Sequence, residues 1–191
     1  MEPLLVTDLK QWVYCPRVVF YRMRMPGAGR PTYKMEEALR AQQRLEDLEM
    51  RRTLREYGLS GAVRQFGVWL TDRDLGLSGR IDLLLRGESD AGVVDFKLTS
   101  GEPGGNHRMQ LNGYALLVEA ALGLPVRMTF LYRIPDGRIF AYPFGDEERM
   151  KVRRSIAEIR QMEVAGELPP PTEVRRRCED CEYANYCADI W

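Results

Sequence analysis

The cysteines of this chain constrain its fold more than any other feature. Three of the four lie within ten residues of one another in "RRRCEDCEYANYC", as Cys178, Cys181 and Cys187, whereas the fourth is Cys15 in "WVYCPR". Any function that uses all four thiols must bring these remote segments together. The fold therefore has to place a segment near the start of the chain against one near the end.

The expected location of the protein bears on what the cysteines do. The start, "MEPLLVTDLK", lacks the basic leader and apolar stretch of a signal peptide, and the most apolar run, "YALLVEAALGL", is interrupted by Glu119 and is too short to span a bilayer. These features predict a cytoplasmic protein without a membrane segment. In a reducing compartment, three clustered cysteines of four favour a metal or metal cluster over disulfides.

Composition gives little guidance about partners. The 191 residues suit one main domain, and 28 basic against 28 acidic side chains give a formal net charge of zero. A polyanion would have to be held by local clusters, although most such clusters are solvated faces. The candidate clusters are Arg51, Arg52 and Arg55; Lys151, Arg153 and Arg154; and Arg175, Arg176 and Arg177.

The hydrophobic pattern predicts an α/β chain. Thr7 can cap a short helix that runs toward Cys15, and Pro16 lies where that helix must end or change direction. A long helix without Gly or Pro is predicted from Met35 to about Tyr57. The other predicted elements are strands at 62–71, 75–86 and 91–100, a helix at 106–122 capped by Asn106 and stopped by Gly123, strands at 125–134 and 137–144, a helix from Asp146 to about Glu163, and a proline-stiffened linker at 166–177. This order implies a mixed sheet flanked by helices, with its first three strands in a meander.

Two neighbouring strands carry candidate site residues. Side chains alternate along a strand, so in "VVDFKL" the side chains of Asp95 and Lys97 share a face. One strand earlier, "SGRIDLLL" places Asp82 in an otherwise apolar run, where burial is costly unless the acid is paired or binds a cation. Two carboxylates on neighbouring strands suit Mg²⁺ or Mn²⁺, and Lys97 would then steady the attacking water or the phosphate.

The next helix adds two polar groups. Gln110 and Tyr114 lie at i and i+4, so they stack on one helix face and can donate hydrogen bonds to a phosphate or orient the lysine. A structural alternative exists for each residue. Asp82 could pair with Arg80 or Lys97, and Gln110 and Tyr114 could form a polar helix edge.

The joint pattern resembles a known family. Gly-x-x-Asp, Asp-x-Lys and Gln-x-x-x-Tyr follow the order of the RecB-like branch of the PD-(D/E)XK nucleases. Through "YCPR", "GRID", "DFK", "QLNGY" and "CEDCEYANYC", the chain resembles the CRISPR-associated "Cas-four" exonucleases over nearly its whole length. The resemblance implies a restriction-endonuclease-like α/β fold, cleavage of DNA, and Mn²⁺ or Mg²⁺ bound by Asp82, Asp95 and the main-chain carbonyl of Phe96.

The resemblance also implies that the four cysteines hold a [4Fe–4S] cluster. A cubane needs one thiolate for each iron, which these cysteines can supply, whereas structural zinc sites more often show two short cysteine pairs. Zinc and unligated thiols remain alternatives. The implied organisation is an N-terminal segment at 1–34 that supplies Cys15, a nuclease core at 35–164, and a linker with an iron–sulfur segment at 165–191. A longer fusion that contains this chain as one domain is an alternative.

One departure from the family pattern concerns its metal-binding histidine. The family carries Gly-x-x-x-His on the helix before the strands, where this chain has Ala38 and Gln42 instead. The Gln42 amide, a water molecule or Glu46, one turn further on, could fill the position. The only histidine, His107, lies on the face of Gln110 if its helix begins at Asn106, and it either approaches the site or is solvated.

These features lead to three functional hypotheses. The first is a metal-dependent nuclease that acts on single-stranded DNA ends or overhangs and, by resemblance, processes prespacers for the CRISPR integrase of Cas-one and Cas-two. Tyr14, Arg17 and Tyr21 could grip the strand, although Trp12 and Tyr14 also suit a core. The second is a catalytically weak DNA-end or motif-recognition module that docks on the integrase. The third is the nuclease subunit of a helicase–nuclease, which would need a separate motor because the chain has no phosphate-binding loop.

Overall fold

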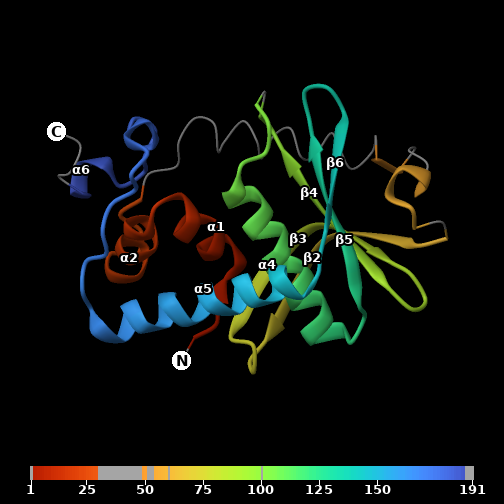
Figure 1. Ribbon diagram of the computed structural model, residues 1–191, viewed down its shortest axis with the longest axis horizontal. Coiled ribbons are helices and arrows are strands. Elements are labelled where there is room, and N and C mark those ends of the chain that lie inside the picture. The colour runs from red at the N-terminus through yellow and green to blue at the C-terminus, as the bar shows by residue number, and fades with distance from the viewer. Residues whose placement is uncertain (1, 30–48, 51–53, 60, 100, 188–191) are drawn as a thin grey trace.

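The computed structural model describes residues 2–29, 49–50, 54–59, 61–99 and 101–187. Helices gather around the first segment of the chain, and a twisted sheet with α4 across it forms the remainder (Figure 1). The elements are β1 Leu4–Leu5, α1 Val6–Tyr14, α2 Pro16–Arg24, a 3₁₀ turn at Leu54–Tyr57, β2 Val63–Asp72, β3 Leu77–Arg86, β4 Ala91–Lys97, α4 Gly105–Leu122, β5 Val126–Arg133, β6 Arg138–Pro143, α5 Asp146–Ala165, a 3₁₀ turn at Arg175–Cys178 and α6 Ala184–Cys187. The predicted order of helices and strands is confirmed from β2 onward.

Within the part of the chain that the structure describes, the sheet has six strands. β2, β3 and β4 form antiparallel hairpins, which confirms the predicted meander, and β5 and β6 form another. β4 and β5 run parallel because α4 crosses between them, as a parallel connection requires. β1 adds a short parallel pairing to the start of β3. The mixed central sheet flanked by helices is therefore confirmed.

Residues 2–29 contain two helices, α1 and α2, where one was predicted. α1 begins at Val6, and the Asp8 carboxylate accepts a hydrogen bond from the Leu5 N–H at 2.8 Å, so the predicted cap at Thr7 is wrong. Cys15 is extended and separates α1 from α2, whose first residue is Pro16. Proline is well suited to a first helical position because its missing N–H would have no intrahelical partner there. Pro16 therefore starts a helix that the sequence analysis did not predict.

Other predicted boundaries hold closely. α4 ends at Gly123 in the left-handed conformation, as predicted, but its first turn begins at Gly105, so Asn106 lies inside the helix and does not cap it. The long helix predicted from Met35 lies mostly outside the described residues. In the described part of that range, residues 49–50 are helical, as predicted, whereas residues 54–57 form a 3₁₀ turn, and Gly58 follows with φ of +67°.

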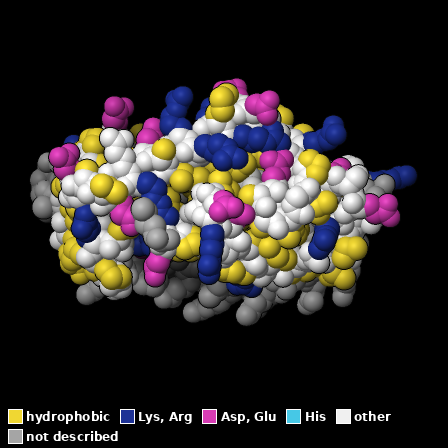
Figure 2. Space-filling model, turned by 90° about the horizontal axis from the view of Figure 1, so that it is seen from below, with side chains coloured by type: hydrophobic (Ala, Val, Ile, Leu, Met, Phe, Trp, Pro, Cys, Tyr) yellow, Lys and Arg dark blue, Asp and Glu magenta, His cyan; other side chains and the backbone are white. Residues whose placement is uncertain are grey.

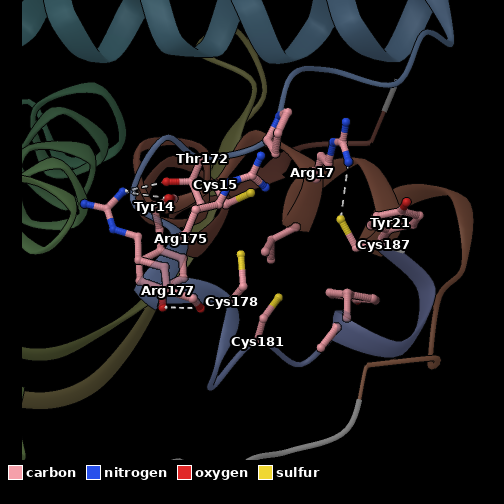
Figure 3. A pocket seen from close by; sticks show the side chains of 14 residues that line it. Tyr14, Cys15, Arg17, Tyr21, Thr172, Arg175, Arg177, Cys178, Cys181 and Cys187 are labelled. Atoms are coloured by element: carbon pink, nitrogen blue, oxygen red, sulfur yellow. Dashed lines mark hydrogen bonds between the residues drawn. The ribbon is translucent and has the colours of Figure 1, made fainter. Parts of the chain in front are cut away.

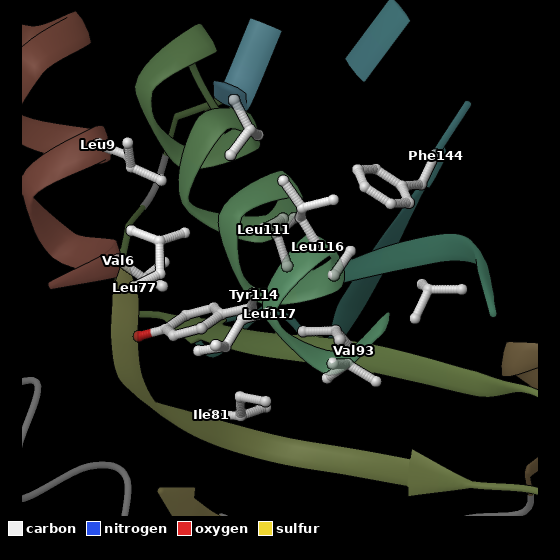
Figure 4. Packing of buried hydrophobic residues seen from close by; sticks show 14 of the residues in the cluster. Val6, Leu9, Leu77, Ile81, Val93, Leu111, Tyr114, Leu116, Leu117 and Phe144 are labelled. Atoms are coloured by element: carbon white, nitrogen blue, oxygen red, sulfur yellow. The ribbon is translucent and has the colours of Figure 1, made fainter. Parts of the chain in front are cut away.

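Apolar side chains cover both faces of the sheet. On one face, α4 packs between α1 and the strands, with Leu111 and Leu117 fully buried against residues such as Val6, Leu9 and Ile81 (Figure 4). The opposite face carries a second cluster, formed by Tyr57, Leu83, Leu85, Val94, Phe96, Phe130 and Tyr132. Within the described ranges, no helix combines the length and apolar character needed to cross a membrane.

Candidate active site

The candidate active site lies where β3 and β4 part. β4 leaves β3 after the pair Leu83↔Val94, and β1 joins β3 only at Leu77 and Ser78. Among the described strands, none pairs with the intervening stretch of β3 on that side, and this stretch contains Asp82. A gap inside a sheet exposes main-chain polar groups that need other partners.

Asp82 bridges this gap. Its Oδ2 accepts a hydrogen bond from the backbone N–H of Phe96 at 3.0 Å, so the side chain takes the place of a β3 carbonyl. The expected partners of a structural Asp82 were basic side chains, and this backbone partner was not anticipated. The contact sets the Asp82 carboxylate against the peptide unit that follows Asp95.

Asp95 and Lys97 form an ion pair on the face covered by α4. Lys97 Nζ lies 2.6 Å from Asp95 Oδ2, and the two side chains are 16% and 1% exposed. Val94 and Phe96 point into the cluster on the opposite face, which confirms the predicted alternation. A buried carboxylate needs such a cation because its desolvation is costly.

Gln110 and Tyr114 stack on α4 as predicted. The Gln110 amide nitrogen donates a hydrogen bond to the Tyr114 hydroxyl at 3.3 Å, and both residues are buried. Burial, followed by the negative charge of Asp95, raises the pKa of the Tyr114 hydroxyl. Tyr114 is therefore a neutral phenol that can donate a hydrogen bond at physiological pH.

The glycine of "GRID" has a steric role. A Cβ added to Gly79 would lie 2.9 Å from Tyr114 Cε1 and 3.1 Å from Val6 Cγ2. Real Cβ atoms essentially never show the 2.9 Å contact, and the 3.1 Å contact is tighter than most, so glycine lets the α4 tyrosine and the start of α1 approach β3 closely at this point. The glycine in Gly-x-x-Asp thus sets how closely α4 covers the site.

Two further residues lie in the electrostatic environment of the acids. Burial, followed by the charge of Lys97, lowers the pKa of Lys10 to about 8, against the attraction of Asp95. Burial, followed by the charges of Lys10 and Lys97, lowers the pKa of His107 to about 4. His107 therefore approaches the site, one of the two positions considered for it. Lys10 was missed, because nothing in the local sequence distinguishes it from a solvated helix lysine.

The four cysteines surround one pocket (Figure 3). We call Cys15 together with residues 175–187 the cysteine module. Cys15 enters from the junction of α1 and α2, and the other three come from the C-terminal 3₁₀ turn, the loop after it and α6. Burial raises the pKa of Cys181, and the charges of the other three cysteines add to this rise. The predicted meeting of remote segments is confirmed.

Arginine side chains join the module to the first helices. Arg177 Nη1 donates to the Tyr14 carbonyl at 2.7 Å, and the Tyr14 hydroxyl donates to the Arg177 carbonyl at 3.0 Å. Arg17 Nε donates to the Pro169 carbonyl at 2.8 Å, and its Nη1 lies 3.4 Å from Cys187 Sγ (Figure 3). The module is thus fastened through side chains and not through a sheet or a long helix.

The aromatic residues named as strand-gripping candidates also belong to this region. Tyr14 and Tyr21 pack against the cluster of Cys15, Val18 and Tyr183, and the Tyr21 and Tyr183 rings stack with centroids 5.8 Å apart. Trp12 packs against the main core and donates its indole N–H to Glu158 at 3.0 Å. Packing explains their presence here, and a role in gripping DNA stays a prediction.

The described residues do not form a compact single-ion site. No group of three or more His, Cys, Asp and Glu side chains within the described ranges converges as ligands of one metal ion would. Ala38, Gln42 and Glu46, which concern the missing family histidine, lie outside those ranges. The two acids and the peptide of Phe96 are adjacent, but the side chains alone do not complete an ion site.

Surface charge is mixed, as the composition suggests. On the face shown in Figure 2, Lys and Arg side chains are interspersed with Asp and Glu. Lys151, in one of the basic clusters, lies 2.6 Å from Glu147. A solvated, paired surface accounts for this cluster.

The sequence of this chain matches the sequence model of one protein family. The model of the PD-(D/E)XK nuclease superfamily matches residues 9–188, which is most of the chain. The chain therefore belongs to the PD-(D/E)XK nuclease superfamily, and it is a nuclease.

Curated relatives narrow the resemblance. The chain is 28% identical over 184 residues to the CRISPR-associated exonuclease Cas4 of Francisella tularensis subsp. novicida, a match that covers 96% of this chain and 93% of the relative. It is 26% identical over 190 residues to the enzyme of the same name from Aeropyrum pernix, with 95% and 93% covered. It is also 32% identical over 126 residues to a Cas4/Cas1 fusion of Myxococcus xanthus, with 62% and 22% covered. The resemblance to this family is confirmed.

Solved structures agree with the fold. The crystal structure of SSO0001 aligns with a TM-score of 0.58 at 18% identity and covers all of this chain and 88% of that one. An alkaline exonuclease from Laribacter hongkongensis aligns with a TM-score of 0.50 at 13% identity, with 86% and 91% covered. At these identities the likeness concerns the fold alone.

Proposed function

We propose that this nuclease is a metal-dependent deoxyribonuclease that cuts single-stranded DNA ends or overhangs and trims prespacers for CRISPR adaptation. One observation carries the proposal. The Asp95–Lys97 ion pair and the Asp82 carboxylate meet at the gap between β3 and β4, where a sheet would otherwise be continuous. Two acids and a lysine beside the Phe96 peptide unit suit hydrolysis of a phosphodiester.

Mn²⁺ or Mg²⁺ would be held by Asp82, Asp95 and the main-chain carbonyl of Phe96. Hard oxygen donors fit these ions, and an octahedral ion keeps several water molecules, so an incomplete set of protein ligands is consistent with such a site. When bound, the ion would supply charge neutralisation and an activated water. Asp82 would bind the ion while its Oδ2 also accepts the hydrogen bond from the Phe96 N–H.

The remaining residues would act on the phosphate and the water. Lys97 sits 2.6 Å from Asp95 and would hold the attacking water or a phosphate oxygen with its ammonium. Tyr114, a neutral phenol, would donate a hydrogen bond, and Gln110 would orient it through the 3.3 Å contact. Catalysis by such groups depends on positioning more than on proton transfer.

The cysteine module would hold a [4Fe–4S] cluster through Cys15, Cys178, Cys181 and Cys187. In a zinc site every thiolate lies about 2.3 Å from one ion, whereas in a cubane each thiolate binds a different iron. Four thiols that surround one pocket without converging on a single ion fit the wider group. The cluster would stabilise the contact between α1, α2 and residues 165–187.

The biological setting rests on the relatives. Two relatives matched over nearly the whole chain are named CRISPR-associated exonuclease Cas4, and a third is a fusion of Cas4 with Cas1. We therefore propose that this chain works with a Cas1–Cas2 integrase, either as a separate subunit or as part of a fusion. The proposed organisation is a nuclease core at 35–164 between a segment at 1–34 and an iron–sulfur segment at 165–191.

The proposal is tested by degradation of end-labelled single-stranded DNA with Mn²⁺, using anaerobically purified protein. The wild type should cut, and Asp95→Ala should lose several kcal/mol of transition-state stabilisation, which is about a thousandfold or more in rate. A circular single strand added in parallel separates attack at ends from internal cleavage. DNA binding without cleavage, even with Cas1 and Cas2 present, would favour the recognition module. Gln42, in place of the family's metal-binding histidine, is the sequence feature that favours this alternative.

A further inference from the structure

A pocket next to the proposed active site contains Lys10, which has no part in the proposed cleavage reaction. It is lined by Lys10 and His107, and by Asp180, Cys181 and Glu182 of the cysteine module, but not by Asp82 or Asp95. The pocket therefore borders the module, and the charges of Asp95 and Asp82 act on the lysine inside it.

Lys10 is half-buried in this pocket. Among the described residues, no carboxylate lies within ion-pair distance of its ammonium group and no hydrogen bond reaches it. Its surroundings combine the positive charge of Lys97 with the negative charges of Asp95, Glu182 and Asp82. A partly desolvated ammonium is costly unless an opposite charge approaches it.

His107 adds a second unsatisfied group to the same pocket. Its Nδ1 is buried and has no hydrogen-bond partner among the described residues. Because the pKa of His107 is lowered to about 4, the ring is neutral at physiological pH and does not compete with Lys10 for an anion. A buried polar atom without a partner calls for a ligand group or a water.

We propose that Lys10 is a phosphate-binding residue of the nuclease, which holds a phosphate of the DNA strand adjacent to the one that is cut, with His107 as its hydrogen-bonding neighbour. The proposal rests on DNA being the substrate. A phosphate there would offset the repulsion between Lys10 and Lys97 and give both polar groups a partner. Asp180 and Glu182 also line the pocket, and the charge of Glu182 acts on Lys10, so the phosphate would share Lys10 with an acidic neighbour.

The first test measures DNA binding and not cleavage. Anisotropy of a labelled single-stranded oligonucleotide is titrated with protein at several salt concentrations, with Ca²⁺ in place of Mn²⁺. Lys10→Met should weaken binding about tenfold and reduce the slope of log Kd against log salt by about 0.7, the value for one phosphate contact on a single strand. Lys10→Arg should retain most of the affinity and the slope.

Lys151→Met is the matched control, because Lys151 is also a lysine of a helix but is half-exposed and already paired with Glu147. It should leave affinity and slope unchanged. The free energy of unfolding provides a second readout. Lys10→Met should be as stable as the wild type or more stable, since it removes a buried charge without a partner, whereas a purely structural lysine would lose stability when replaced.

A scan of single methylphosphonate linkages locates the contact. In the wild type, neutralising the contacted phosphate should weaken binding, and in Lys10→Met the same linkage should have no effect while the others keep theirs. Equal salt slopes, or identical scans in the two proteins, would overturn the assignment of Lys10 while leaving nuclease activity established. A wild type that neither binds nor cuts DNA would overturn the proposed substrate and this inference together.

Discussion

The nuclease core and the cysteine module hold their functional residues by different means. In the core, Asp95 is 1% exposed and lies on β4, a strand of the sheet between β3 and β5. In the module, the 3₁₀ turn and α6 have four residues each and no buried side chain in either. The core site is thus part of a large hydrophobic structure, whereas the module has only the small cluster around Tyr183 and a few long-range hydrogen bonds such as those of Arg17 and Arg177.

This difference predicts different dependence on bound groups. The sheet and α4 bury enough apolar surface to fold without any ligand, because burial is the main stabilising term in folding. Segments with little buried surface and few backbone hydrogen bonds open easily. We therefore expect the core to stay folded without the proposed metal ion and the module to open without the proposed cluster.

The largest expected effect breaks the module alone. Cys15→Ala should reduce iron from about four atoms per chain to background, because the remaining three thiols cannot ligate every iron of a cubane. The linker at 166–174 should then become sensitive to limited proteolysis while the sheet stays intact. Iron and sulfide assays with timed digestion check this, and Tyr186→Phe, at a partly exposed residue of α6, serves as control. Full iron content in Cys15→Ala would refute the cluster assignment.

A smaller effect should appear in the core. Gly79→Ala forces a Cβ to within 2.9 Å of the Tyr114 ring, so we expect a loss of about 2 kcal/mol in the free energy of unfolding, with reduced cleavage. Gly101→Ala is the matched control, since nothing lies within 4 Å of its added Cβ. Urea unfolding compares the two. Equal midpoints for both variants would show that Tyr114 can shift at no cost.

The smallest effect concerns the boundary between the two regions. His107 has a pKa of about 4 in the folded chain, below its ordinary 6.5, so the unfolded chain binds more protons between those values. Stability from the neutral imidazole is thus present above pH 6.5 and is lost as pH falls toward 4. His107→Gln should be less sensitive in this window, by roughly 1 kcal/mol. Denaturant midpoints at pH 7 and pH 5 measure it; identical pH dependence would place His107 in water.

Local pattern predicted much of the core and its site. Period-two alternation identified the shared face of Asp95 and Lys97, and the i, i+4 spacing identified the contact of Gln110 with Tyr114, because both relations depend only on backbone geometry within one element. Gly123 also stopped α4 as predicted, since a left-handed residue there is a local requirement.

Contacts between different strands and helices could not be predicted from the local sequence pattern. The parting of β3 and β4 at Asp82 depends on where α1 and β1 insert, and Lys10 reaches the site only because α1 packs on α4. Such contacts leave no periodic signal in the local sequence. Pro16 could not be interpreted from the sequence alone, because a proline can end one helix or begin another. In the structure, Cys15 is extended, so α1 ends before it and Pro16 begins α2.

The split origin of the four thiols sets an order of events during synthesis. Cys15 is made early, but its three companions come from residues 178–187, after the strands and α4. A ribosome that has produced only the nuclease core presents one thiol, whereas the proposed cluster needs four. Loading of that cluster would therefore follow translation of the core, and a chain truncated before residue 178 should hold no iron.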